Sequence, residues 1–265
     1  MAGRLVVCPT PIGNLEDVTL RVLRTLREAD AIACEDTRQT RKLLDRHGIE
    51  GARLVSYHEH NERRRAVELA HRIETGAVVA LVSDSGMPVI SDPGYVLLRE
   101  CVARDLEVEV LPGPSAVVTA LVASALPPDR WCFVGFLPRK AGELRTTLEQ
   151  AGETLVAFES PGRLPKTLAL LAEVDPGRSV AVCRELTKVH EEVVRGSARE
   201  VAERFGAGTR GEIVLVIGPA AAAAGDLPHA REAVETLVAA GARRRAAAKV
   251  VSGLTGVPAN RLYRE

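Results

Sequence analysis

The chain of 265 residues is predicted to adopt an α/β fold with two lobes and a small helical C-terminal extension. Short runs of β-branched residues alternate with amphipathic segments, which is typical of βαβ units around a mostly parallel sheet. The length suits about two domains of about 100–150 residues. Hydrophobic residues make up 46% of the chain and charged residues 26%, so the chain can bury real cores and is not of a disordered class.

The first lobe is predicted over residues 1–113. Leu20, Leu23 and Leu26 recur at a spacing that places them on one side of a helix. Two prolines and a glycine in residues 111–116 (LPGPSA) separate a strand from a helix, so we expect the lobe to end near residue 113. The expected strands are residues 4–8, 31–34, 78–82 and 108–111, and the expected helices are 19–28 and 95–103.

The second lobe is predicted over residues 114–222 and a helical basic tail over 223–265, with a linker at 220–226. Two strands on either side of Lys188 are joined too closely for a helical crossover, so this lobe is expected to have a mixed sheet. The expected strands are residues 132–135, 154–158, 180–183, 192–195 and 213–217, and the expected helices are 143–150, 164–173 and 198–204.

Charge and hydropathy exclude several classes of protein. Lys plus Arg and Asp plus Glu both number 35, so a uniformly basic protein that coats nucleic acid is excluded. No apolar run approaches the roughly 20 residues that cross a bilayer, so we expect a cytoplasmic protein with no membrane partner. Local basic patches remain, and they are either phosphate contacts or solvated helix faces. They contain Arg63, Arg64, Arg243, Arg244, Arg245 and Lys249.

Common nucleotide and hydrolase motifs do not fit this chain. A GxGxxG pattern at residues 206–211 follows a predicted helix and leads into a strand, which is the reverse of the dinucleotide-binding order. No Walker A segment and no G-x-S-x-G elbow is present. The sequence therefore disfavours a P-loop nucleotidase and an α/β-hydrolase.

Four turn-rich segments each follow a predicted strand. They are residues 8–14, 34–38, 83–94 and 111–116. Because ligands of open α/β sheets bind at the carboxyl ends of the strands, we expect these segments to line one site. Each segment taken alone is equally typical of a plain turn, and Asp92 followed by Pro93 is also a possible helix start.

His58 and His60, with Glu59 between them, raise the question of a metal site. In a loop this spacing sets no geometry, and no third ligand cluster accompanies it, so we expect no metal. His58 is more simply interpreted as a polar contact to substrate.

Several motifs, taken together, resemble one known family. They include PTPIGNLEDVTLR at residues 9–21, LVSDSGMPVISDPG at 81–94, LPGPSA at 111–116 and CRELTKVHEEVVRG at 183–196. These segments resemble the tetrapyrrole methylase superfamily and, within it, the members that methylate a cytidine ribose 2′-hydroxyl in 16S rRNA. The chain lacks the glycine-rich G-x-G-P-G-D start of many members that act on porphyrin-like rings.

The resemblance implies a fold, a cofactor and partners. It implies two α/β lobes with S-adenosylmethionine in the cleft between them, a homodimer, and 16S rRNA or the small ribosomal subunit as substrate. The implied cofactor contacts are Pro11, Ile12, Asp84, Met87, Ser115, Ala116, Leu186, Glu212 and Ile213. The expected RNA contacts are Arg38, Arg63, Arg64, Arg243, Arg244, Arg245 and Lys249.

A ribose hydroxyl is a weak nucleophile, so a nearby base would assist its methylation. Glu35 and Asp36 are the first candidates because they end a predicted strand, and His58 and Glu59 follow. The alternative is that Glu35 and Asp36 only orient Arg38 or cap the following helix. Two other functions stay open: a methylase of a small ring or of a protein side chain, and a non-catalytic RNA-binding assembly factor.

Overall fold

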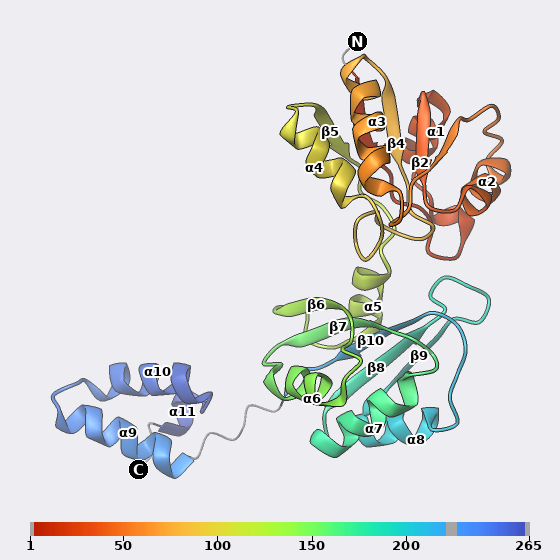
Figure 1. Cartoon of the computed structure of the whole chain (residues 1–265). Helices are drawn as coiled ribbons and strands as arrows, with labels where there is room; N and C mark the ends of the chain where they lie inside the picture. Colours follow the sequence, from red (N-terminus) through yellow and green to blue (C-terminus); the bar gives the residue numbers. More distant parts are fainter. Residues whose placement is uncertain (1–2, 221–226, 263–265) are drawn as a thin grey trace. The chain divides into compact units, whose positions relative to one another are not determined.

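The computed structural model describes residues 3–220 and 227–262 and confirms the α/β class, with two five-stranded sheets (Figure 1). The chain divides into two compact units that interleave along the sequence. The first contains Met1–Ala123, Cys183–Val193 and Gly211–Val214, and the second contains Ser124–Val182, Val194–Arg210 and Leu215–Glu265. In residues 3–220 and 227–262 no helix has the length and apolar character needed to cross a membrane.

The first sheet is parallel throughout and has the order β3-β2-β4-β1-β5. Its strands are β1 (Arg4–Val7), β2 (Ala31–Cys34), β3 (Leu54–Ser56), β4 (Val78–Leu81) and β5 (Glu107–Val110). The sequence prediction missed β3. This strand has three residues and all three are only partly buried, so it lacks the buried β-branched run that marks the other strands.

Helices cover both faces of this sheet (Figure 1). They are α1 (Leu20–Glu28), α2 (Thr37–Arg46), α3 (Glu62–Glu74) and α4 (Tyr95–Ala103), with a short 3-10 helix at Leu15–Asp17. Because side chains alternate along a strand, Val6 packs with α1 and α2 on one face. Its neighbours Leu5 and Val7 pack with α3 and α4 on the other face. The helix predicted at residues 95–103 is confirmed at those bounds.

The second sheet has the order β6-β7-β10-β8-β9 and is mixed, as predicted. β6 and β7 are parallel. The Glu185 amide donates to Glu212 O, and the Gly218 amide donates to Ser179 O, so β8 and β10 are antiparallel. The strands are β6 (Trp131–Phe136), β7 (Thr154–Glu159), β8 (Ser179–Arg184), β9 (Glu192–Ser197) and β10 (Ile213–Ile217), and the helices are α6 (Ala141–Gln150), α7 (Leu164–Val174) and α8 (Ala198–Phe205). The helix α5 (Ala116–Ser124) precedes β6 and belongs, except for Ser124, to the first unit.

The C-terminal segment forms three helices, α9 (Leu227–Ala239), α10 (Arg244–Thr255) and α11 (Ala259–Leu262). They share a core of small and branched side chains, in which Val234, Ala248 and Val251 are buried. The helical tail predicted at residues 223–265 is thus helical over its described part, while residues 223–226 and 263–265 of that prediction lie outside the described residues.

Candidate functional site

The first sheet has a switch point between β1 and β4. The chain leaves β1 toward β2 on one side of the pair and leaves β4 toward β5 on the other side. The helix α1, which follows β1, packs on one face of the sheet, and α4, which follows β4, packs on the other. Open α/β sheets bind ligands at the carboxyl ends of adjacent strands whose connections run to opposite faces. The two segments that leave this point, residues 8–14 and 82–94, contain four of the nine expected cofactor contacts.

The segments that follow β1 and β4 are joined by their backbones. Thr10 and Gly86 exchange hydrogen bonds in both directions, at 2.9 and 3.0 Å between nitrogen and oxygen. The Thr10 hydroxyl donates to Ser83 O at 3.0 Å, and the Ser83 hydroxyl donates to Gly86 O at 3.1 Å. Thr10 and Ser83 are both buried, so these bonds hold the two segments in one fixed arrangement.

Gly86 is required by this arrangement for two reasons. Its φ of +80° lies in the left-handed region that glycine adopts readily. A Cβ at this position would lie 3.3 Å from Ile12 Cγ2 and 3.9 Å from Pro114 O. The segments that follow β1, β4 and β5 therefore converge at Gly86, and Ile12 and the residue preceding Ser115 border the same point.

A fourth segment, distant in sequence, reaches the segment that follows β1. The Asn14 amide donates to Thr187 Oγ1 at 2.9 Å. A Cβ on Gly13 would lie 3.0 Å from Leu186 O, so the two backbones approach closely. The Lys188 ammonium lies 3.0 Å from Glu185 Oε1 and 3.1 Å from Glu212 Oε2, which ties Glu212 to the same segment.

All nine residues expected to contact a cofactor accordingly belong to the first compact unit. They are Pro11, Ile12, Asp84, Met87, Ser115, Ala116, Leu186, Glu212 and Ile213. Leu186, Glu212 and Ile213 were assigned to the second lobe in the sequence, yet they pack with the first unit. The close approach at Gly13 and the hydrogen bond to Thr187 are the reason.

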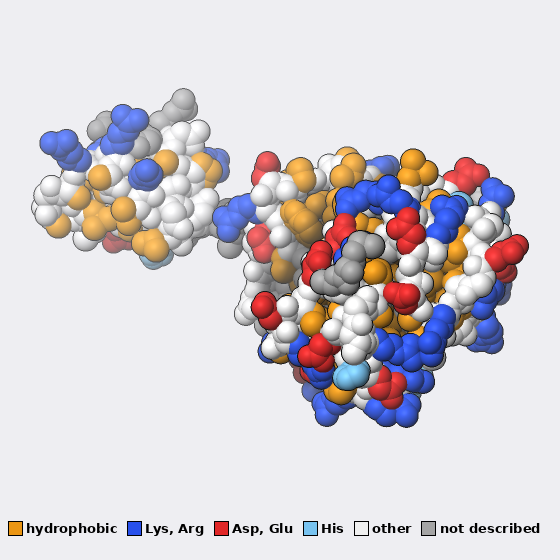
Figure 2. All heavy atoms as spheres, turned by 90° about the horizontal axis from the view of Figure 1, so that it is seen from above, with side chains coloured by type: hydrophobic (Ala, Val, Ile, Leu, Met, Phe, Trp, Pro, Cys, Tyr) orange, Lys and Arg blue, Asp and Glu red, His pale blue; other side chains and the backbone are white. Residues whose placement is uncertain are grey.

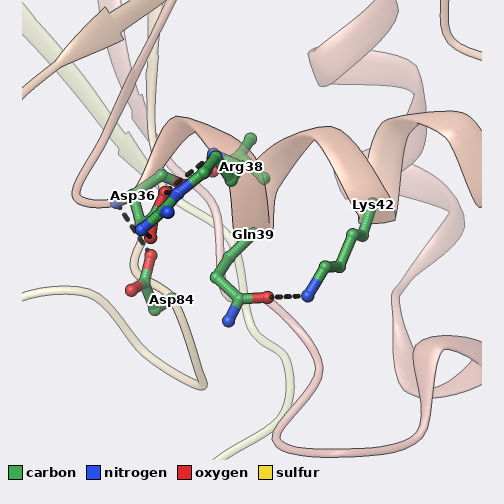
Figure 3. Close-up of polar contacts among 6 residues, drawn as sticks. Asp36, Arg38, Gln39, Lys42 and Asp84 are labelled. Atoms are coloured by element: carbon green, nitrogen blue, oxygen red, sulfur yellow. Dashed lines mark hydrogen bonds and ion pairs between the residues drawn. The ribbon is translucent and has the colours of Figure 1, made fainter.

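Asp36 is engaged by its own helix and by a neighbouring segment (Figure 3). Its Oδ1 accepts from the Arg38 amide at 2.8 Å and so caps α2, and its Oδ2 accepts from the Arg38 guanidinium at 2.8 Å. These contacts with Arg38 hold the pKa of Asp36 down at about 2. The Asp36 amide donates to Asp84 Oδ1 at 3.0 Å, which links the segments that follow β2 and β4.

Three other carboxyl groups near this point have raised pKa values. Burial raises the pKa of Glu35, and the charge of Asp84 adds to the effect. Burial likewise raises the pKa of Asp84. The pKa of Asp92 rises to about 6 because of burial first and the charge of Glu35 second. Carboxyl groups with raised pKa values at the ligand-binding edge of a sheet are candidates for proton transfer.

Asp92 was not among the site residues expected from the sequence. Its position before a proline suggested the N-cap of a helix, but that interpretation was wrong, because the N-cap of α4 is Gly94. Its partial burial beside Glu35 and Asp84 depends on the fold of residues 82–94. The only signal in the sequence was a second aspartate in a segment already assigned to the site.

His58 lies two residues after the end of β3, and its ring packs edge-on to that of His60 at 5.9 Å between centroids. His58 Nε2 lies 3.0 Å from Asn61 Nδ2. Its other ring nitrogen, Nδ1, is buried and has no hydrogen-bond partner in the structure. Across residues 3–220 and 227–262, no three His, Cys, Asp or Glu side chains are arranged to hold a metal ion.

The basic residues expected to bind RNA lie mostly at the surface. Arg63 and Arg64, near the start of α3, are exposed and line a surface pocket with Glu59–Glu62. Arg38 is exposed and lines another pocket with Arg41. In the C-terminal helices Arg243, Arg245 and Lys249 are exposed, whereas Arg244 forms a two-pronged ion pair with Glu235 at 2.6 and 2.7 Å. Figure 2 shows Lys and Arg side chains on these helices beside exposed hydrophobic side chains.

The fold and the site define the class of protein. A parallel sheet whose switch-point segments are tightly bonded, with partly buried carboxyl groups at its carboxyl edge, is typical of an α/β enzyme that binds a small ligand there. The family model for tetrapyrrole (corrin/porphyrin) methylases matches residues 4–202. The chain belongs to this family, which confirms the resemblance found in the sequence, and it is therefore a methyltransferase.

Curated relatives are similar over nearly the whole chain. The ribosomal RNA small subunit methyltransferase I of Mesorhizobium japonicum is 44% identical, over 98% of this chain and 90% of its own length. The protein of the same name from Mycobacterium tuberculosis H37Rv is 45% identical, over 99% and 94%. The uroporphyrin-III C-methyl transferase of Thermus thermophilus, solved with S-adenosyl homocysteine, shares the fold with a TM-score of 0.56 and 21% identity, over 82% of this chain and 97% of that chain.

Proposed function

We propose that this methyltransferase uses S-adenosylmethionine to methylate the ribose 2′-hydroxyl of a cytidine in the 16S rRNA of the small ribosomal subunit. The observation that carries the proposal is the identity of 44–45%, over almost the full length, to relatives named ribosomal RNA small subunit methyltransferase I. The segment PTPIGN at residues 9–14, which follows the first strand, also lacks the glycine-rich pattern of many enzymes that act on porphyrin-like rings.

The residues at the switch point fit the cofactor. At both Gly86 and Gly13 a Cβ would contact a neighbouring segment, so the segments pack closely there without side chains between them. Such close approach of backbones is suited to a site in which backbone groups contact a ligand. Buried Ile12 and Leu186 offer apolar contact surface, and exposed Asp84 offers a carboxylate. S-adenosylmethionine supplies a methyl group on a sulfonium, whose transfer releases a neutral thioether. Pro11, Met87, Ser115, Ala116, Glu212 and Ile213 complete the proposed contacts.

Glu35 is the proposed proton acceptor for the ribose hydroxyl. Its raised pKa makes it a better base than an ordinary carboxylate, and it follows β2 at the carboxyl edge of the sheet. Asp36 is poorly suited, since Arg38 holds its pKa at about 2. We assign Asp36 the role of fixing the start of α2 and the position of Asp84. Because methyl transfer is mainly a matter of alignment, a base of this kind typically adds about 10²- to 10⁴-fold to the rate.

RNA is proposed to bind through exposed basic side chains. Arg38, Arg63 and Arg64 lie on the same unit as Glu35, and Arg243, Arg245 and Lys249 lie on the C-terminal helices. The chain has few aromatic residues, 3% in all, so phosphate contacts and shape would dominate over base stacking. We further propose a homodimer, for which α5 exposes Val118 and Val122 on one face, and a cytoplasmic location, where ribosomal subunits are assembled.

The proposal is tested by methylation of small ribosomal subunits from cells that lack the enzyme, with naked 16S rRNA as a parallel substrate. Radiolabelled methyl groups should enter the rRNA, and one cytidine should become resistant to alkaline hydrolysis because its 2′-oxygen is blocked. Glu35→Gln should bind the cofactor normally and transfer methyl groups far more slowly. Label that enters a uroporphyrinogen-type ring or a protein, with none in rRNA, would replace the proposed substrate. RNA binding without any methyl transfer would leave only an assembly role.

A further inference from the structure

The Asn61 side chain is oriented by two backbone groups of fixed polarity. Its Oδ1 accepts from the His58 amide at 3.0 Å, and its Nδ2 donates to Ser56 O at 3.2 Å. Because a peptide N–H can only donate and a peptide carbonyl can only accept, the amide cannot be turned over without losing both bonds. Asn61 Nδ2 is therefore the nitrogen that faces His58 Nε2 at 3.0 Å.

This contact determines the tautomer of His58. An amide NH₂ group has no lone pair to offer, so His58 Nε2 must be the acceptor and cannot carry a hydrogen. The neutral imidazole then has its hydrogen on Nδ1. Nε2 is occupied by Asn61, so His58 is not available to accept a proton through that atom. The ring instead offers a single N–H donor.

That donor is buried, and it has no partner in the structure. A buried N–H without an acceptor is costly, so such a group points to a contact made during function. β2 and β3 are neighbours, and the Tyr57 amide donates to Cys34 O at 2.8 Å. The last pair of the two strands is Cys34 and Ser56, so Glu35 lies one residue and His58 two residues beyond that pair, at the same edge of the sheet. His58 lowers the pKa of Glu35, against the burial and the neighbouring acidic charges that raise it.

Resting on the function proposed above, we infer that Asn61 is a positioning residue that holds His58 in its Nδ1–H tautomer, and that this N–H donates to the Glu35 carboxylate when it accepts the ribose proton. His58 is thereby a donor that orients the base and is not itself the base. Four other carboxyl groups repel the charge of Glu35 and raise its pKa or have their own pKa raised by it: Asp36, Glu59, Asp84 and Asp92. The His58 N–H is the group that opposes this repulsion.

The first experiment reads the tautomer without any activity assay. Long-range ¹H–¹⁵N NMR of protein labelled in histidine should show the hydrogen of His58 on Nδ1. Asn61→Asp has the same shape but presents an oxygen to Nε2, so the hydrogen should move to Nε2. A wild-type spectrum with the hydrogen on Nε2 would overturn the inference, whether or not the protein methylates rRNA.

The second experiment compares two polar substitutions of His58, each of which retains an N–H donor at one of the two ring-nitrogen positions. The amide nitrogen of His58→Asn lies near the position of Nδ1, whereas that of His58→Gln lies near Nε2. ¹³C NMR titration of Glu35 should give a pKa close to that of the wild type in His58→Asn and a higher one in His58→Gln. The kcat should stay within a few-fold for His58→Asn. It should fall about 10- to 100-fold for His58→Gln and Asn61→Asp, because a Glu35 carboxylate without its hydrogen bond loses more in alignment than it gains in basicity.

The exposed His71 of α3 supplies the control, because His71→Gln changes an imidazole of the same unit outside the His58–Asn61 turn and should leave both the Glu35 titration and kcat unchanged. The KM for S-adenosylmethionine should be unaffected in every variant. Equal Glu35 titrations in His58→Asn and His58→Gln would refute the donor role. Inactive wild-type protein on rRNA would instead refute the proposed function, while the two NMR experiments would still decide the inference.

Discussion

Gly86→Ala tests whether the switch-point segments form the cofactor site. At φ of +80°, an L-residue costs about 1–2 kcal/mol relative to glycine. The new methyl group would also lie 3.3 Å from Ile12 Cγ2, so the Ile12 side chain must shift by a few tenths of an ångström. The melting temperature should fall by about 2–8 °C, at about 2–4 °C for each kcal/mol.

The same substitution should weaken cofactor binding. In Gly86→Ala the segments that follow β1 and β4 can shift to relieve the strain, and the cofactor must then return them to their original positions in order to bind. The free energy of binding is thereby weakened by up to the same 1–2 kcal/mol, which raises the Kd about 5- to 30-fold. Isothermal titration calorimetry with S-adenosylmethionine measures this directly.

Gly48→Ala is the matched control for Gly86→Ala. Gly48 has a φ of +60°, but nothing lies within 4 Å of the position of its Cβ. It should lower the melting temperature through the backbone cost alone and leave the Kd unchanged. The reasoning fails if Gly86→Ala lowers the melting temperature but binds the cofactor as tightly as Gly48→Ala, because the segments at Gly86 would then not border the ligand.

Three further predictions concern Asp84, Asp92 and the basic side chains of the C-terminal helices. Asp84→Ala should raise the Kd for S-adenosylmethionine about 10- to 100-fold. Asp84→Asn keeps an acceptor for the Asp36 amide, so it separates the loss of charge from the loss of that hydrogen bond. Unchanged calorimetric affinity in Asp84→Ala would remove Asp84 from the site. Burial raises the pKa of Asp92 from 3.8 to about 6, so the folded state holds this proton more tightly and its stabilising effect, complete below about pH 4, is lost as the pH rises through 6. Urea unfolding should show a shallower loss of stability over that range in Asp92→Asn, and equal slopes would contradict the assignment. Arg243→Glu combined with Lys249→Glu should weaken RNA binding and leave cofactor affinity unchanged. The slope of log K for RNA against log salt concentration should fall by about one unit for each lost phosphate contact. RNA binding identical to that of the wild type across a salt titration would exclude these side chains as contacts.

Much of the first unit could be predicted from the sequence because its signals are local. The buried runs at β1, β2 and β4 are continuous and apolar, and α4 was predicted at its observed bounds. The strand β3 was missed because its three residues are only partly buried. Its placement depends on pairing with β2, a contact between segments about twenty residues apart.

The candidate site was predictable only in outline. Turn-forming residues after each strand indicate where ligand-binding segments lie, because the carboxyl ends of parallel strands share one edge. The state of each side chain there was not accessible. The sequence offered the pairing of Asp36 with Arg38 and the cap of α2 only as an alternative, which the structure confirms for Asp36. Nothing in the order of residues shows that Asp92 is partly buried beside Glu35.

The amino-acid sequence by itself determined the alternation of strands and helices, the segments at the sheet edge and the family, since each depends on neighbouring residues or on motifs read in order. Only the tertiary structure decided that Leu186 approaches Gly13, that Lys188 pairs with Glu212, and that Asn61 sets the hydrogen of His58 on Nδ1. Those outcomes arise from backbone approaches and hydrogen bonds of 3 Å or so, whose geometry exists only once the chain has folded.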